Sequence, residues 1–305
     1  MTPKHYLFLA RRTLAAFVAH HSLRMSAALS YYTLLSMAPL ILIVLSLAGL
    51  WWDRPAAAAK MIDEMNRFLG PAGAEMVRTI LDNAQEASFG FGAGFVGLGA
   101  TLFAAAIVFL SLQDAVNVIW RVQPKKGRRL WSSVKKRLFS LAMILIVGVL
   151  LFASVVITTS ISALQRLLSY EWTEQLFVWQ TVNFFVSALI ISLLFGAIYR
   201  YLPDMKLHWR DVALGAGVAG VLFVLGKMLL GLYLSRLNLG KAYGAAGSIV
   251  IFLVWVYYSS VIMLAGAELT RVQTLLRRPD VEPSSDAEWA PHHRAESANE
   301  AWLKF

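Results

Sequence analysis

The chain has 305 residues, of which 58% are hydrophobic and only 15% are charged. A soluble domain carries about 25% charged residues, so this composition excludes an ordinary water-soluble protein and indicates a membrane protein with several spans. The chain has no cysteine, which excludes disulfides and thiolate metal sites.

The first predicted element is a basic amphipathic helix at residues 4–23. Its apolar residues can share one face: Leu7, Leu14, Phe17 and Val18. We expect this helix to lie on the cytoplasmic surface of the membrane. A helix buried in a protein core is the alternative.

Six apolar stretches follow, each long enough to cross a bilayer as a helix, which takes roughly 20 residues. They lie at about 26–52, 93–119, 138–162, 178–199, 211–235 and 244–267. Between the first two, the amphipathic residues 53–91 predict a helical hairpin on the periplasmic side, divided at Gly70 and Pro71. The predicted fold is therefore all-α, with a transmembrane domain at 1–272. We expect the tail at 273–305, which is polar from Pro279, to be disordered.

The basic residues are concentrated on one predicted side of the membrane. Most of the 28 Lys and Arg residues lie in the N-terminal segment, in the loops at 121–137 and 200–210, and in the tail. The positive-inside rule then places both termini in the cytoplasm, and it explains the net charge of +10 without nucleic acid. We expect the cluster Lys125, Lys126, Arg128 and Arg129 to bind anionic lipid headgroups. RNA is the alternative ligand of this cluster.

One lysine lies near the middle of a predicted span. Lys227 falls inside the stretch 211–235, where a lysine costs about 2.5–3.5 kcal/mol, so it is expected to face the bundle interior and to bind an anionic group. In the alternative interpretation, its side chain extends to the outer interface of the membrane.

Other polar residues of the predicted spans are candidates for a site. Arg24 and Glu268 both fall at cytoplasmic helix ends, which predicts a structural ion pair, with a gate as the alternative. Asp114 and Asn117 lie three residues apart, near one helix face, and could line a polar path or touch the basic loop. Four tyrosines could line a groove for an amphiphile or serve in helix packing: Tyr31, Tyr32, Tyr257 and Tyr258.

The sequence offers little support for enzyme chemistry. It lacks the P-loop lysine motif, HExxH and GxSxG. Residues 92–97 spell GxGxxG, but no strand is predicted before them, so we reject a dinucleotide site. We therefore predict no catalytic residue, no metal and no cofactor.

Several segments near the two ends of the chain carry a family resemblance. They are the segments 27–36 (AALSYYTLLS), 253–259 (LVWVYYS) and 266–269 (GAEL), with Tyr243, Gly244, Gly247 and Ser248, and more weakly Asn117, Trp120 and 199–203. On these residues the chain resembles the YihY/BrkB family of bacterial inner-membrane proteins. The resemblance implies a multi-pass protein of the bacterial inner membrane. The family has sometimes carried a ribonuclease label, but the scattered Asp and Glu residues do not resemble a metal-carboxylate nuclease site.

These observations favour a transporter, flippase or exporter of a lipid-like or anionic envelope amphiphile. A scaffold that binds anionic lipids and protein partners through the basic loop is the alternative, and a membrane-bound hydrolase is a third interpretation. The expected partners are membrane lipids and not nucleic acid, and an oligomer is compatible with the sequence. The environment of Lys227 distinguishes the transporter hypothesis from the scaffold hypothesis. A lysine that faces outward would not serve an internal site, which would count against the transporter.

Overall fold

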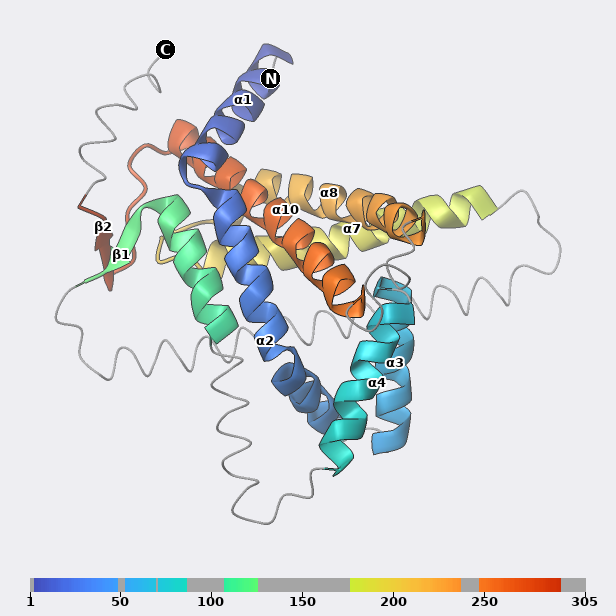
Figure 1. The fold of residues 1–305 in the computed structure, drawn as a ribbon. Coiled ribbons are helices and arrows are strands. Elements are labelled where there is room, and N and C mark those ends of the chain that lie inside the picture. The colour runs from blue at the N-terminus through green and yellow to red at the C-terminus, as the bar shows by residue number, and fades with distance from the viewer. Residues whose placement is uncertain are drawn as a thin grey trace. The chain divides into compact units, whose positions relative to one another are not determined.

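The computed structural model describes residues 3–48, 53–69, 71–86, 107–125, 176–236 and 247–291. These residues are mostly helical (Figure 1). The helices are α1 (Pro3–Ala19), α2 (Ser22–Ala48), α3 (Arg54–Leu69), α4 (Pro71–Glu86), a helix at Ile107–Trp120, α7 (Leu176–Tyr201), α8 (Trp209–Arg236) and α10 (Gly247–Arg277). Two short strands are β1 (Val122–Pro124) and β2 (Ala287–Trp289).

Three described helices are long and apolar enough to cross a membrane, at Phe184–Tyr201, Trp209–Leu230 and Ile249–Arg277. They coincide with the predicted spans 178–199, 211–235 and 244–267. The first predicted span, 26–52, is helical as α2 up to Ala48. The second, 93–119, is described only from residue 107, and the third, 138–162, lies outside the described residues. A helical membrane protein is therefore supported, while the count of six spans stays a prediction.

The chain divides into two units, which are described in turn. Unit 1 comprises residues 1–22, 113–224 and 262–305, and unit 2 comprises residues 23–112 and 225–261. In unit 1, α7, α8 and α10 approach closely at glycines. A methyl group added at Gly220 of α8 would lie 2.9 Å from the carbonyl oxygen of Ala188 on α7, and one at Gly266 of α10 would lie 2.7 Å from Cβ of Ala219 on α8. Such contacts are typical of helix packing in membranes.

The chain beyond α10 is ordered up to residue 291, so the predicted disordered tail is wrong for residues 273–291. α10 continues to Arg277, and β2 then pairs antiparallel with β1, with Val122 opposite Trp289. An isolated antiparallel β-bridge between Met205 and Pro283 joins the α7–α8 connection to the segment after α10. The sequence reasoning missed this because a polar, proline-containing segment can still be held by backbone hydrogen bonds to two loops.

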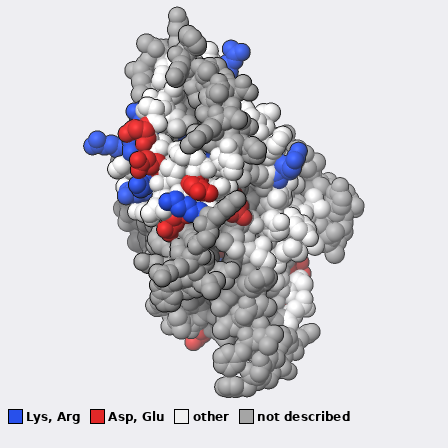
Figure 2. Space-filling view, turned by 90° about the vertical axis from the view of Figure 1, so that its left-hand side faces the viewer, with Lys and Arg blue, Asp and Glu red and all other residues white. Residues whose placement is uncertain are grey.

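The face of the molecule on the left of Figure 1 is shown in Figure 2. On this face the described acidic and basic side chains lie beside one another (Figure 2). A contact of this kind in the described chain joins Nζ of Lys206 to Oε2 of Glu282 at 3.0 Å. The described residues on this face therefore mix the two signs of charge. Three members of the predicted basic cluster, Lys126, Arg128 and Arg129, lie outside the described residues.

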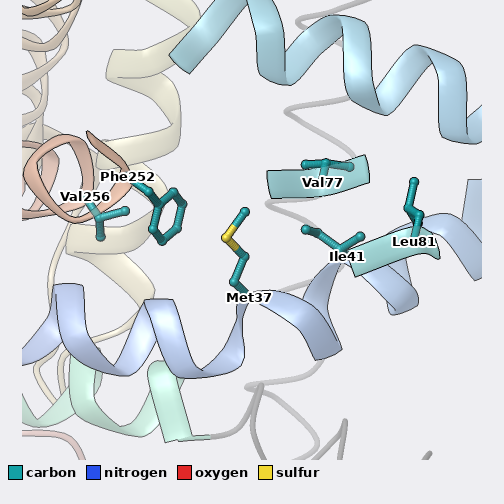
Figure 3. Close-up of a cluster of buried hydrophobic side chains, with 6 residues drawn as sticks. All are labelled: Met37, Ile41, Val77, Leu81, Phe252 and Val256. Carbon is teal, nitrogen blue, oxygen red and sulfur yellow. The ribbon is translucent and has the colours of Figure 1, made fainter. Parts of the chain in front are cut away.

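Unit 2 has its own apolar core. Met37 and Ile41 of α2, Val77 and Leu81 of α4, and Phe252 and Val256 of α10 form a buried cluster (Figure 3). α3 and α4 pack against each other at the place of the predicted hairpin. Helix α4 carries its apolar residues at Met76, Val77, Ile80 and Leu81, the spacing that turns one face toward a core. That the hairpin is periplasmic stays a prediction.

Candidate functional site

The candidate site is built around a carboxylate that is fully removed from solvent. Glu268 lies on α10 and has no exposed surface. Its Oε1 lies 2.6 Å from Nδ1 of His20, whose side chain is 9% exposed. Arg121 contacts the other ring nitrogen, because its Nε donates to Nε2 of His20 over 3.2 Å. We call His20, Arg121 and Glu268 the buried triad.

The turns that carry the triad have an unusual backbone. His20 lies between α1 and α2, and Arg121 follows the helix at Ile107–Trp120. His21 and Arg121 have φ values of 53° and 55°, and they are the described non-glycine residues with positive φ. The left-handed region is the usual way to end a helix, but glycine is the residue that normally occupies it. Two helices therefore end in uncommon turns at the triad.

Other large or polar side chains of unit 1 are buried as well. Trp120 and Tyr199 are each 1% exposed. The Tyr199 hydroxyl donates to the carbonyl oxygen of Met263 over 2.7 Å, one turn before Glu268 on α10. Arg12 of α1 is buried and places its guanidinium 4.0 Å from the centre of the Phe8 ring. Among the described residues, Oε2 of Glu268 has no hydrogen-bond partner.

A second polar contact joins the helix at Ile107–Trp120 to the α7–α8 connection. Nδ2 of Asn117 donates to Oδ2 of Asp204 over 3.3 Å, and Oδ1 of Asn117 accepts from the backbone N–H of Asp204 over 2.9 Å. Both residues are buried. Asp114, which was predicted to share a face with Asn117, is exposed instead. Asn117 therefore anchors a loop, and the two residues do not line one buried path in the described structure.

The predicted pair between Arg24 and Glu268 stays a prediction, because the two residues belong to different units of the chain. The described partner of Glu268 is His20, and Arg24 is exposed on α2. A weak sign of this arrangement is present in the sequence, because His20 ends an amphipathic helix. Nothing in the sequence pointed to Arg121, one basic residue among several in its loop.

Lys227 does not face the interior of unit 2. It is exposed on α8, between the exposed side chains of Leu225 and Met228. It interacts electrostatically with Glu64 of α3. The exposure is what the alternative interpretation of this lysine expects, and an internal anion site at this residue stays a prediction.

The four candidate tyrosines lie in different surroundings. Tyr31 is 56% exposed and Tyr32 is 36% exposed, both on α2. Tyr257 and Tyr258 of α10 are half-buried, and the Tyr258 hydroxyl lies against Gly226 of α8. Tyr258 therefore packs between helices of unit 2, as the alternative interpretation had it.

The described part of the basic cluster is tied to the tail. Nζ of Lys125 donates to the carbonyl oxygen of Ser285 over 2.9 Å. Within the described residues, no group of three His, Asp or Glu side chains could hold a metal ion. Among the described ionisable groups, Glu268 of the triad is a carboxylate with no exposed surface.

Comparisons with known proteins give the family. A family model described as "Virulence factor BrkB" matches residues 13–291. A UPF0761 membrane protein of Photobacterium profundum is 30% identical over 277 residues, which cover 87% of this chain and 83% of that protein. One from Vibrio parahaemolyticus is 34% identical over 249 residues, covering 79% and 74%.

A further relative is longer than this chain. A UPF0761 membrane protein of Alkalilimnicola ehrlichii is 31% identical over 254 residues, which cover 82% of this chain and 54% of that protein, so the match spans about half of its length. No solved structure matches the chain. The family model and the relatives agree over most of the sequence, and the chain therefore belongs to the BrkB family of membrane proteins.

Proposed function

We propose that the protein transports a lipid-like, anionic amphiphile of the cell envelope across the bacterial inner membrane, with both termini in the cytoplasm. The observation that carries the proposal is Glu268, a fully buried carboxylate on α10, a helix long and apolar enough to cross a membrane. Ionisable residues in membrane helices usually mark substrate or ion pathways, because they are costly to insert.

A purely structural role explains this carboxylate less well. Replacing a buried ion pair by apolar residues of similar volume is often neutral or stabilising, so a buried pair is weak evidence for stability. Packing of α7, α8 and α10 is already provided by their close contacts at Gly220 and Gly266. A charged group that the packing does not need supports a role in transport.

The expected charge of the cargo is based on the basic residues of unit 1. Arg12, Arg271 and Glu268 are all buried in unit 1, and Arg121 contacts His20. The planar guanidinium group suits phosphate and carboxylate groups, which it can bind through two parallel hydrogen bonds. The apolar surface of the spans suits acyl chains. An anionic headgroup with lipid tails matches both features, and the proposal assigns no catalytic residue.

The proposal differs from the sequence-based hypothesis in the residues that carry it. Lys227 was the expected internal site, but it is exposed and interacts with Glu64. The buried triad now takes that place. Lys227 accordingly serves as a control position in the experiments below.

The test is a lipid-movement assay with the full chain in liposomes. Vesicles of phosphatidylethanolamine and phosphatidylglycerol would carry trace phosphatidylglycerol with a fluorescent headgroup, and dithionite would report the probe that reaches the outer leaflet. We expect faster probe movement than in protein-free vesicles, and a loss of that gain in Glu268→Gln. Glu75→Gln, which changes an exposed carboxylate of α4, is the matched control and is expected to behave as wild type. Movement no faster than in protein-free vesicles would overturn the proposal in favour of a scaffold.

A further inference from the structure

The geometry of the buried triad points to a proton site. We propose that His20, Glu268 and Arg121 form a site that takes up one proton in addition to the proton shared by His20 and Glu268. Uptake of this added proton releases Arg121 and drives the transport proposed above. The coupling to transport depends on that proposed function, whereas the proton binding does not. Two atoms can accept the added proton, Nε2 of His20 and Oε2 of Glu268.

The contacts fix the protonation state of the histidine. A guanidinium group has only donors and keeps its proton in proteins. Because Nε of Arg121 lies 3.2 Å from Nε2 of His20, Nε2 must be the acceptor and carries no proton. The hydrogen between Nδ1 and Oε1 of Glu268, at 2.6 Å, is then the proton of the pair. In the described arrangement Arg121 is positively charged. His20 and Glu268 share one proton and together carry one negative charge, so the net charge of the triad is zero.

A second proton cannot enter without changing these contacts. On Nε2 it would point at the N–H of Arg121, so the two donors would repel and Arg121 would have to leave. On Oε2 of Glu268, which has no hydrogen-bond partner among the described residues, it would neutralise the carboxylate. The triad would then carry a net positive charge beside Glu268, which has no exposed surface. Such a charge is costly away from water, so proton uptake favours a different arrangement.

Unit 1 has other buried charged groups, which belong to several elements. Arg12 of α1 and Arg271 of α10 are buried basic residues of this unit. From α7, Tyr199 is engaged with Met263. The buried carboxylates of the α7–α8 connection and of α8 have partners of their own, because Asp204 bonds Asn117 and Asp211 bonds Arg278 over 2.8 Å. Glu268 is therefore the acidic group on which the triad depends.

The backbone around the triad suits a movement of this kind. His21 and Arg121 end their helices in the left-handed region, at φ values of 53° and 55°. Non-glycine residues with such a backbone concentrate at switch regions and active sites. The backbone carbonyl of Arg121 also accepts from the N–H of Ala290 over 2.9 Å, which connects the triad to the strand pair. The strand pair thus holds the backbone of Arg121, so a movement at this residue would be one of its side chain.

The proton site is tested first without transport. Infrared difference spectra of the full chain in liposomes, recorded between neutral and acidic pH, report carboxyl groups that gain a proton. We expect a buried carboxyl band in wild type that is absent in Glu268→Gln and retained in Glu75→Gln. His20→Asn, which keeps a polar side chain and removes the imidazole ring, is expected to alter the same band. Helical content of each variant by circular dichroism excludes loss of fold. A spectrum of Glu268→Gln identical to that of wild type would overturn the proposal.

The coupling is tested in the lipid-movement assay with an imposed pH gradient. We expect the gradient to accelerate movement of the fluorescent phosphatidylglycerol in wild type and to have no effect in Glu268→Gln. Movement that is equally fast with and without the gradient in wild type would overturn the coupling and leave the proposed function intact. A carboxyl band assigned to Glu268 in a protein that moves no probe would support the proton site and overturn the proposed function.

Discussion

Nδ1 of His20 lies 2.6 Å from Oε1 of Glu268, although 248 residues separate them in the sequence. This contact ties the turn after α1 to α10 inside unit 1. Because Glu268 has no exposed surface, its charge depends on the few groups that touch it.

We expect His20→Ala to destabilise the protein by about 3–5 kcal/mol, because it leaves a buried carboxylate without its histidine partner. The double variant His20→Ala with Glu268→Gln is expected to recover part of this loss, since it removes the charge as well. Unfolding in mixed micelles, arranged as a double-mutant cycle, measures the coupling free energy. Strictly additive effects of the two substitutions would contradict a direct interaction.

We expect His21→Gly to leave the protein as stable as wild type or more stable. Glycine in a helix normally costs about 1 kcal/mol relative to alanine, but the left-handed backbone of His21, at φ 53°, suits glycine better than any other residue. Ala10→Gly, at an exposed site in the middle of α1, is the matched control and is expected to show the normal loss. Thermal unfolding of the two variants gives the comparison, and equal losses would count against the described turn.

We expect Gly220→Ala to disrupt unit 1 and Gly217→Ala to be tolerated. A methyl group at Gly220 would meet the carbonyl oxygen of Ala188 at 2.9 Å, whereas one at Gly217 has nothing within 4 Å. Both glycines lie in α8, so the gain in helix propensity, about 1 kcal/mol, is the same for both. The difference in thermal stability between the variants isolates the helix contact, and similar stabilities would show that α7 and α8 do not approach here.

We expect removal of residues 279–305 to expose and loosen the segment at 121–125, whereas removal of 292–305 is expected to leave it protected. The shorter truncation keeps β2, which pairs with β1, and keeps the buried side chains of Val281 and Ala287. Hydrogen exchange at Val122 and at Lys125, whose backbone N–H donates to Asp286, reports the effect. Equal protection in both truncations would contradict a structural role for the strand pair.

We expect Lys227→Met to change the stability by at most about 1 kcal/mol, because charge interactions at exposed sites contribute little. The movement of labelled phosphatidylglycerol is expected to stay the same. Lys227 is exposed and its interaction is with Glu64. Native mass spectrometry from lipid nanodiscs measures bound amphiphile in parallel. Loss of a stoichiometric amphiphile in this variant alone would restore the internal site that sequence reasoning placed at Lys227.

The helical elements could be predicted from hydropathy, because the hydropathy of a segment depends only on the residues within it. The predicted spans 178–199, 211–235 and 244–267 agree with α7, α8 and α10 within a few residues at most ends. The end of α10 is the exception, since it runs on to Arg277 as a helix whose Val272 and Thr274 are buried. A polar helix extension that packs on neighbours has no hydropathy signal.

Hydropathy and short motifs were sufficient for the membrane class, the family and the helical segments, because a run of apolar residues has one low-energy conformation in lipid. Which ionisable groups meet became visible only in the folded chain. Arg24 and Lys227 were reasonable candidates by position along the chain, yet both are exposed, while His20, Arg121 and Glu268 come together from three distant segments. Hydropathy averages over neighbours in sequence and gives no direction to a side chain, whereas a buried charge is governed by the groups within a few ångströms of it in space.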